Sequence, residues 1–215
     1  MRFGVCLIHI GNKKFQAITI MNWKNSGDFD NPAIVTILVK EPPIMKSGIE
    51  PLVNDGFAGE ATKRTLAYLQ AQREKGNKIV GIYCGYAPLE VIRAMGAAPA
   101  VLCAFAHRTI EAAETVLPAN LCPLIKSSYG FLKTDTCPFF AISDAVIAET
   151  TCDGKKKMFE LIADLKPMHV MDLPQIPDYG EALENWTKMI RKLKRFLERT
   201  FQVTIHDADV EKEIK

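Results

Sequence analysis

The feature that most constrains the fold is a regular alternation of short apolar runs with amphipathic stretches between residues 60 and 201. The apolar runs have the length of buried strands and lie at residues 78–84, 99–105, 145–150 and 168–173. Amphipathic helical patterns follow these runs, and the last and strongest covers residues 181–199. Strands that alternate with helices predict an α/β fold, flavodoxin-like or Rossmann-like, with a parallel four-stranded sheet and helices on both faces.

The chain outside this alternation is less informative. Residues 1–55 form an N-terminal segment of unknown role, with candidate strands at residues 15–21 and 33–39 and an isolated Cys6 that is expected to be a packing residue. Residues 56–201 form the cysteine-bearing α/β domain. Residues 202–215 include the charged sequence DADVEKEIK. This predicts a helix that packs on nothing and begins a connector to a missing second domain.

Composition excludes several functional classes. The net charge of +2 is too small to indicate a nucleic-acid partner. No apolar run approaches the roughly 20 residues that cross a bilayer, and the start of the chain lacks the cleavage site of a signal peptide. We therefore expect a cytoplasmic protein without a membrane partner. In that reducing compartment, six cysteines favour metal binding or catalysis over disulfides.

Three of the cysteines, Cys122, Cys137 and Cys152, lie fifteen residues apart. Cys152 follows the third predicted strand and precedes a helix, whose N-terminal partial charge favours a thiolate. Cys84 ends the first predicted strand, and parallel strands end at the same edge of a sheet. We expect Cys84, Cys122 and Cys152 to face one region there, with Cys137 close by. There is no C-x-x-C, G-x-G-x-x-G or Walker A pattern.

Five sequence blocks carry a resemblance to a known family. In chain order they are YCGYAPLEVIRAMGAAP, LPANLCPLIKSSYGF, DTCPFF, ETTCDGKKKMFELI and KPMHVMDLPQ. Together they resemble the 2-hydroxyacyl-CoA dehydratase D-component superfamily, which also contains benzoyl-CoA reductase subunits and double-cubane cluster proteins. The amino-acid sequence of these blocks is most similar to that of the double-cubane branch, and the resemblance covers residues 60–215.

The resemblance implies an iron–sulfur cluster, [4Fe-4S] or double-cubane, held by cysteines between two Rossmann-like domains. Cys84 and Cys122 match the family's cluster cysteines, and Cys137 and Cys152 fit the ligands that a larger cluster needs. An ATP-hydrolysing iron–sulfur activator protein would inject an electron. The electron would drive dehydration of a 2-hydroxyacyl-CoA or reduction of a small molecule. Because family chains continue with a second domain, another domain or subunit, or a dimeric assembly, would complete the site.

Other side chains have two interpretations. Ser127 and Ser128 would bond cluster sulfides or substrate, or would satisfy the backbone of their loop. Glu149 is a proton-transfer candidate if buried, or a residue at a surface edge. Lys155 and the two lysines after it indicate a solvated helix start, or a patch that binds anions or a partner. Cys103 is expected in the core because it falls inside a predicted strand.

Two alternatives to an iron–sulfur enzyme component stay open. One is a truncated, non-catalytic α/β binding domain that kept the fold. The other is a zinc-stabilised module that uses the same thiols. We also expect an exposed apolar surface near Cys84 and Cys122, where a second domain would pack.

Overall fold

The computed structural model describes residues 3–10, 13–22, 33–40, 57–103, 105–176 and 179–214; side chains are described from Gly59 onward, apart from Tyr179. The chain divides into two compact units, Met1–Lys46 and Ser47–Lys215. Within the described ranges, no helix combines the length and the apolar character needed to cross a membrane.

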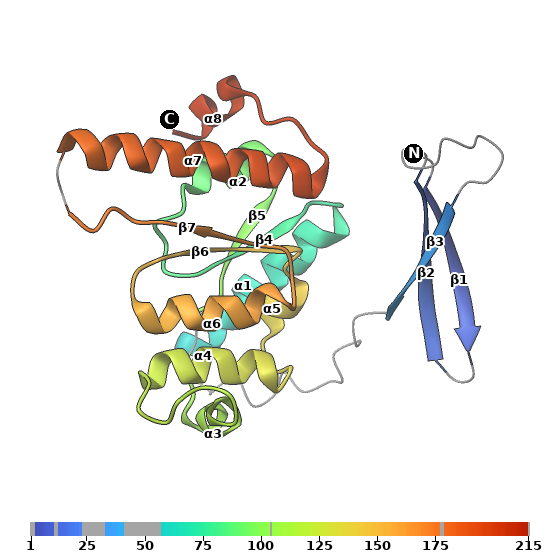
Figure 1. Cartoon of the computed structure of the whole chain (residues 1–215), viewed down its shortest axis with the longest axis horizontal. Helices are drawn as coiled ribbons and strands as arrows, with labels where there is room; N and C mark the ends of the chain where they lie inside the picture. Colours follow the sequence, from blue (N-terminus) through green and yellow to red (C-terminus); the bar gives the residue numbers. More distant parts are fainter. Residues whose placement is uncertain are drawn as a thin grey trace. The chain divides into compact units, whose positions relative to one another are not determined.

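The first unit is an antiparallel sheet with the strand order β1-β2-β3 (Figure 1). The strands are β1 (Phe3–Ile10), β2 (Lys13–Asn22) and β3 (Ala33–Lys40), and all three are rich in the β-branched residues that strands favour. β2 and β3 confirm the strands predicted at residues 15–21 and 33–39, whereas β1 was not predicted. The side chain of Cys6 lies outside the described residues, so its packing role stays a prediction.

The second unit contains a four-stranded, all-parallel sheet with the order β5-β4-β6-β7 (Figure 1). The strands are β4 (Ile79–Ile82), β5 (Ala98–Val101), β6 (Ala145–Glu149) and β7 (Met168–Met171). The predicted α/β fold and its four strands are confirmed. Because β4 lies between β5 and β6, the winding direction reverses between β4 and β6. In open α/β sheets, ligands bind beyond the carboxyl ends of the strands at such a switch point.

Helices connect and follow these strands. They are α1 (Phe57–Glu74), α2 (Leu89–Ala94), α3 (Ile110–Glu114), α4 (Pro123–Lys133), α5 (Pro138–Ile142), α6 (Asp153–Ala163), α7 (Tyr179–Phe201) and α8 (Asp207–Ile214), with a 3₁₀ turn at His107–Thr109. The sequence predicted loops where α4 and α5 lie. Each of these helices begins with the proline after a cysteine, a residue whose fixed φ suits the first helical position.

The two faces of the sheet bury different residues, as strand alternation requires. Val80, Ile82 and Ile147 pack with α2, α7 and α8, whereas Val146 and Ala148 pack with α4, α5 and α6. Figure 1 shows α7 and α6 on opposite sides of the strands. This arrangement confirms helices on both faces.

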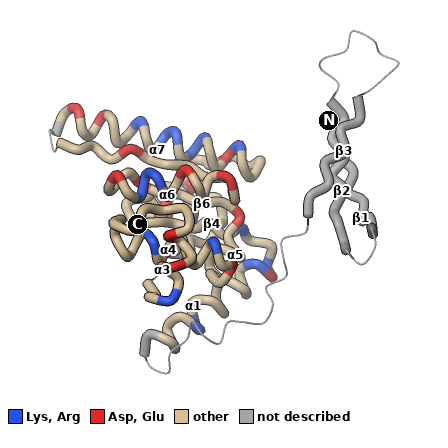
Figure 2. Tube along the Cα trace, turned by 60° about the horizontal axis from the view of Figure 1, so that its bottom comes forward, with Lys and Arg blue, Asp and Glu red and all other residues tan. Residues whose placement is uncertain are grey.

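The C-terminal helices differ in one respect from the expectation. α8 was predicted to pack on nothing, but it packs against α2, and its Val210 joins the apolar cluster on that face. The helix is short and charged, and the ion pair between Lys194 of α7 and its Asp207 (2.6 Å) also ties it to the domain. Figure 2 shows Lys and Arg recurring along α7, and the exposed members confirm its solvated face: Lys188, Arg191, Lys192, Arg195 and Arg199.

Candidate functional site

Cys84 lies two residues beyond β4, at the switch point of the sheet. The ladder continues as far as Tyr83, whose N–H donates to the Ile147 carbonyl at 2.9 Å. Cys84 then adopts a φ of 72°, a left-handed conformation that is uncommon for residues other than glycine. Gly85 follows with a φ of 105°. The chain therefore turns sharply out of the sheet and holds a half-buried thiol at its carboxyl edge.

Polar groups surround the Cys84 sulfur. Lys155 Nζ donates to Cys84 Sγ at 2.7 Å, and Thr151 Oγ1 lies 3.4 Å from the same sulfur. The Cys103 side chain interacts with the same thiol. The interaction with Cys103, opposed by burial and assisted by Lys155 and Thr151, lowers the pKa of Cys84 to about 5. Cys84 is therefore a thiolate at neutral pH, the form that binds metals.

Cys152 belongs to the same neighbourhood through Lys155. It is exposed, directly precedes α6, and follows the Thr151 that contacts Cys84. Burial lowers the pKa of Lys155, but the bond with Cys84 and the nearby Cys103 and Cys152 outweigh burial and raise it overall. Lys155 thus contacts the Cys84 thiol and lies near those of Cys103 and Cys152, at the start of α6, a helix N-terminus that favours negative charge.

Cys122 is exposed and directly precedes α4. α4 packs against α6, and the side chains of Leu121 and Ile125 lie against Gly154 in the first turn of α6. The two helix starts that follow Cys122 and Cys152 are therefore neighbours.

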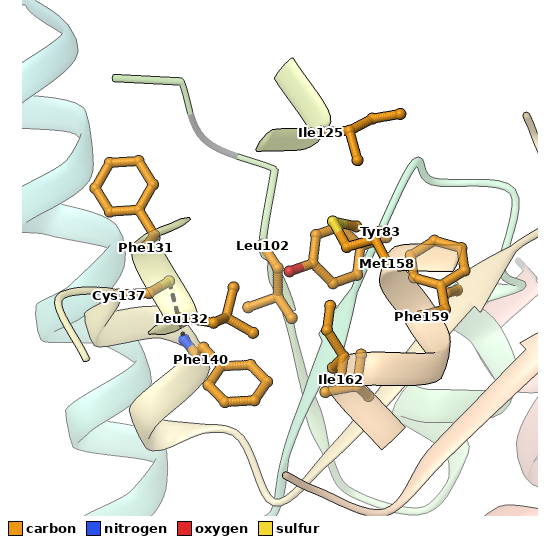
Figure 3. Packing of buried hydrophobic residues seen from close by; sticks show 12 residues of the cluster. Tyr83, Leu102, Ile125, Phe131, Leu132, Cys137, Phe140, Met158, Phe159 and Ile162 are labelled. Atoms are coloured by element: carbon orange, nitrogen blue, oxygen red, sulfur yellow. Dashed lines mark hydrogen bonds between the residues drawn. The ribbon is translucent and has the colours of Figure 1, made fainter. Parts of the chain in front are cut away.

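Cys137 is placed differently. It precedes α5, and its buried sulfur accepts a hydrogen bond from the Phe140 N–H at 3.4 Å. Figure 3 shows this bond, with Leu132 close to the same helix turn. Burial raises the pKa of the Cys137 thiol. Cys137 therefore lies inside the apolar cluster between the sheet and α4–α6, whereas Cys84 packs against that cluster from its edge.

Cys103 is the thiol that sequence reasoning missed. It is exposed, and the expectation of a core position was wrong because β5 ends at Val101, earlier than predicted. A signal was present in the sequence. The apolar runs KIVGIYC and PAVLC both end in cysteine, and neighbouring parallel strands bring such ends together.

Glu149, the last residue of β6, lies on the other side of Cys84. Its side chain is fully buried (0% exposed), so Glu149 is not a residue at a surface edge. Oε1 accepts a hydrogen bond from the Ala87 N–H at 2.5 Å, and Oε2 has no partner among the described residues. Burial, assisted by the nearby Cys84 and opposed by backbone N–H groups and Lys155, raises the pKa of Glu149 to about 7. The carboxyl group therefore anchors the loop that carries Cys84 and titrates near neutrality.

Ser127 and Ser128 are buried in α4. Ser127 Oγ accepts from the Ala106 N–H at 2.7 Å, lies 3.0 Å from the Ala106 carbonyl oxygen, and contacts the Thr109 hydroxyl at 3.1 Å. These contacts match the alternative in which this serine satisfies loop backbone. They fasten the chain after Cys103 to α4.

The donor set suits a cluster better than a single ion. Within the described part of the chain, no three His, Cys, Asp or Glu side chains surround a point where one metal ion would bind. A structural zinc needs four ligands around one ion. The thiols of a cluster bind separate irons and need only share a face. Cys84, Cys103 and Cys152 all lie near Lys155, on the side of the sheet where such a shared face would be.

Large apolar side chains are exposed next to Cys84, Cys103 and Cys122 in the sequence. Tyr86, Phe105 and Leu124 are 61%, 59% and 39% exposed, and each follows a cysteine by two residues. Exposed apolar groups that gather near one site are typical of surfaces that another domain or chain covers.

Comparisons with known proteins concern the same part of the chain. The family model described as 2-hydroxyglutaryl-CoA dehydratase, D-component, matches residues 84–215. The protein named "Putative dehydratase subunit YjiM" from Escherichia coli (strain K12) is 46% identical over 151 residues, which cover 70% of this chain and 39% of that protein. The chain thus spans about two fifths of the length of this relative.

Proposed function

Because the chain belongs to the 2-hydroxyglutaryl-CoA dehydratase D-component family, we propose that it is an iron–sulfur component of a dehydratase or of a double-cubane-type reductase. The observation that carries the proposal is the group of thiols around Lys155, at the carboxyl edge of the sheet and within the family match. Thiolates at a topological switch point provide both the ligand chemistry and the usual ligand position of this fold.

Cys84, Cys122 and Cys152 are the ligands that we propose from the resemblance and the placement together. Cys137 was expected among them, but we leave it out because its side chain is buried in the apolar cluster. A bound cluster would supply an electron at low potential. Lys155 contributes a positive charge that offsets the negative charge of the thiolates, and the Thr151 hydroxyl contacts Cys84. Both would tune the site through hydrogen bonds to sulfur.

Glu149 is the residue that we propose as a proton carrier. A carboxyl group with a pKa of about 7 exchanges a proton near the pH of a cytoplasm. The unpartnered Oε2 leaves one oxygen available for that exchange. The substrate would be an acyl-CoA thioester or another small molecule.

Further chains belong to the proposal. The thiols occupy one open edge, so a second domain or subunit would supply the remaining ligands and cover Tyr86, Phe105 and Leu124. An ATP-hydrolysing iron–sulfur activator would deliver the electron. The five cysteines whose side chains are described are free thiols, as suits a reducing cytoplasm.

Anaerobic reconstitution with iron and sulfide tests this function. Several irons per chain together with acid-labile sulfide, and a paramagnetic signal after reduction, would support it. Protein that binds no metal would point to the non-catalytic α/β binding domain. Zinc without sulfide would point to the zinc-stabilised module.

A further inference from the structure

The sheet brings Cys103 and Cys84 together by register. Ile82 of β4 is paired with Val101 of β5, and the Leu102 N–H donates to the Ile82 carbonyl at 2.9 Å. Cys84 and Cys103 each follow the last residue of their strand by two positions, so they lie next to one another just beyond the paired strand ends. Their pairing follows from the sheet and does not depend on the conformation of a long loop.

The two cysteine side chains interact. The side-chain interaction between the two thiols is the largest cause both of the lowered pKa of Cys84 and of the raised pKa of Cys103. Both lie near the ammonium group of Lys155, whose Nζ is 2.7 Å from Cys84 Sγ. Cys103 is exposed, so a metal can reach its sulfur without any rearrangement of the core.

Cys137 lacks these properties. The residue is only 6% exposed and belongs to the apolar cluster of Figure 3, and its sulfur accepts a hydrogen bond from the Phe140 N–H in the first turn of α5. To bind iron it would have to leave this cluster, and both a cavity and an unpaired N–H would remain. Such changes are unfavourable in a packed core.

We propose that Cys103, and not Cys137, joins Cys84 and Cys152 in the thiol face that this chain presents to an iron–sulfur cluster. This inference rests on the proposed function for the identity of the metal group. It assigns a ligand that the resemblance did not provide. On binding, the Cys103 thiol forms a sulfur–iron bond and releases its proton to solvent, with no change in the oxidation state of sulfur.

The test compares Cys103→Ser with the matched variant Cys137→Ser in the full chain. After anaerobic reconstitution, iron and sulfide are measured, and each cysteine is mapped by iodoacetamide labelling and mass spectrometry. We expect Cys103 to be labelled in the metal-free protein and protected in the loaded protein. Cys103→Ser should lose iron and the protection of Cys84, whereas Cys137→Ser that keeps the wild-type circular dichroism should keep both.

The outcomes separate this inference from the proposed function. If the wild type loads iron and sulfide but Cys103 is labelled at its metal-free rate and Cys103→Ser loads equally, the inference is overturned and the function stands. If the wild type loads no iron and sulfide, the proposed function fails. Cadmium titration of the same proteins then decides the thiol assignment. Binding that Cys103→Ser loses and Cys137→Ser keeps supports it, and equal binding by both variants refutes it.

Discussion

Replacing Glu149 with Gln should change how the stability of the protein depends on pH. The carboxyl group is fully buried, and its pKa rises from 4.5 to about 7, chiefly because burial disfavours its charge. The folded protein therefore binds more protons than the unfolded chain between these two pH values. Its stability falls as pH rises through that window, and the full penalty is present above pH 7.

The size of the effect follows from the pKa. A rise from 4.5 to about 7 corresponds to about 3 kcal/mol as an upper limit, at about 1.4 kcal/mol for each tenfold change. Relaxation of the loop and entry of water around the charge reduce this, so we expect about 1–2 kcal/mol. Gln keeps an oxygen for the Ala87 N–H and stays neutral at every pH. The difference in free energy of unfolding between Glu149→Gln and wild type should therefore shift by that amount in favour of the variant as the pH rises from 5 to 8.

Urea unfolding at several pH values measures the difference. Groups that do not interact with Glu149 titrate alike in both proteins, so the comparison reports the ionisation of Glu149 together with its coupling to Cys84. Glu160→Gln is the matched control, because Glu160 is an exposed carboxylate of α6 that pairs with Lys157. Parallel stability curves for wild type and Glu149→Gln would show that Glu149 is ionised in the folded protein without penalty, and the reasoning from burial would be refuted.

Two further variants test the site and its support. Lys155→Met should raise the pKa of Cys84 and slow the labelling of this thiol by iodoacetamide at pH 6, because the 2.7 Å contact is lost. The control Lys157→Met replaces an exposed lysine and should leave the labelling rate unchanged. Equal labelling rates in both variants would contradict a role for Lys155. Gly130→Ala should destabilise the fold by about 2 kcal/mol or more, because the added Cβ would overlap the Thr109 carbonyl. Gly154→Ala should lower the melting temperature less, because its added Cβ would meet only the flexible side-chain ends of Leu121 and Ile125, at 2.8 Å. The reverse order of melting temperatures would contradict this packing.

Periodicity was sufficient for the strands, because each apolar run of the second unit contains a strand, and the two central ones, β4 and β6, are fully buried. It was insufficient for α4 and α5. α4 contains Ser and Gly, and α5 is only five residues long, so the helical state of both depends on the proline after Cys122 and Cys137 and on burial against the sheet. Tertiary packing overrides weak local propensity in such short helices. The burial of Cys137 follows from that packing, so the sequence alone did not reveal it.

The order of the strands explains why some site residues were predictable and others were not. The end of a strand can be located from sequence, and Cys84 and Cys152 were placed correctly at the edge of the sheet on that basis. The neighbours of Cys84 depend on the order β5-β4-β6, which brings Cys103 to one side and Glu149 to the other. Cys103 lowers the pKa of the Cys84 thiol, while the charge of Cys84 raises the pKa of Glu149. A different strand order would keep every local element and remove both effects, so the chemistry of Cys84 is a property of the topology.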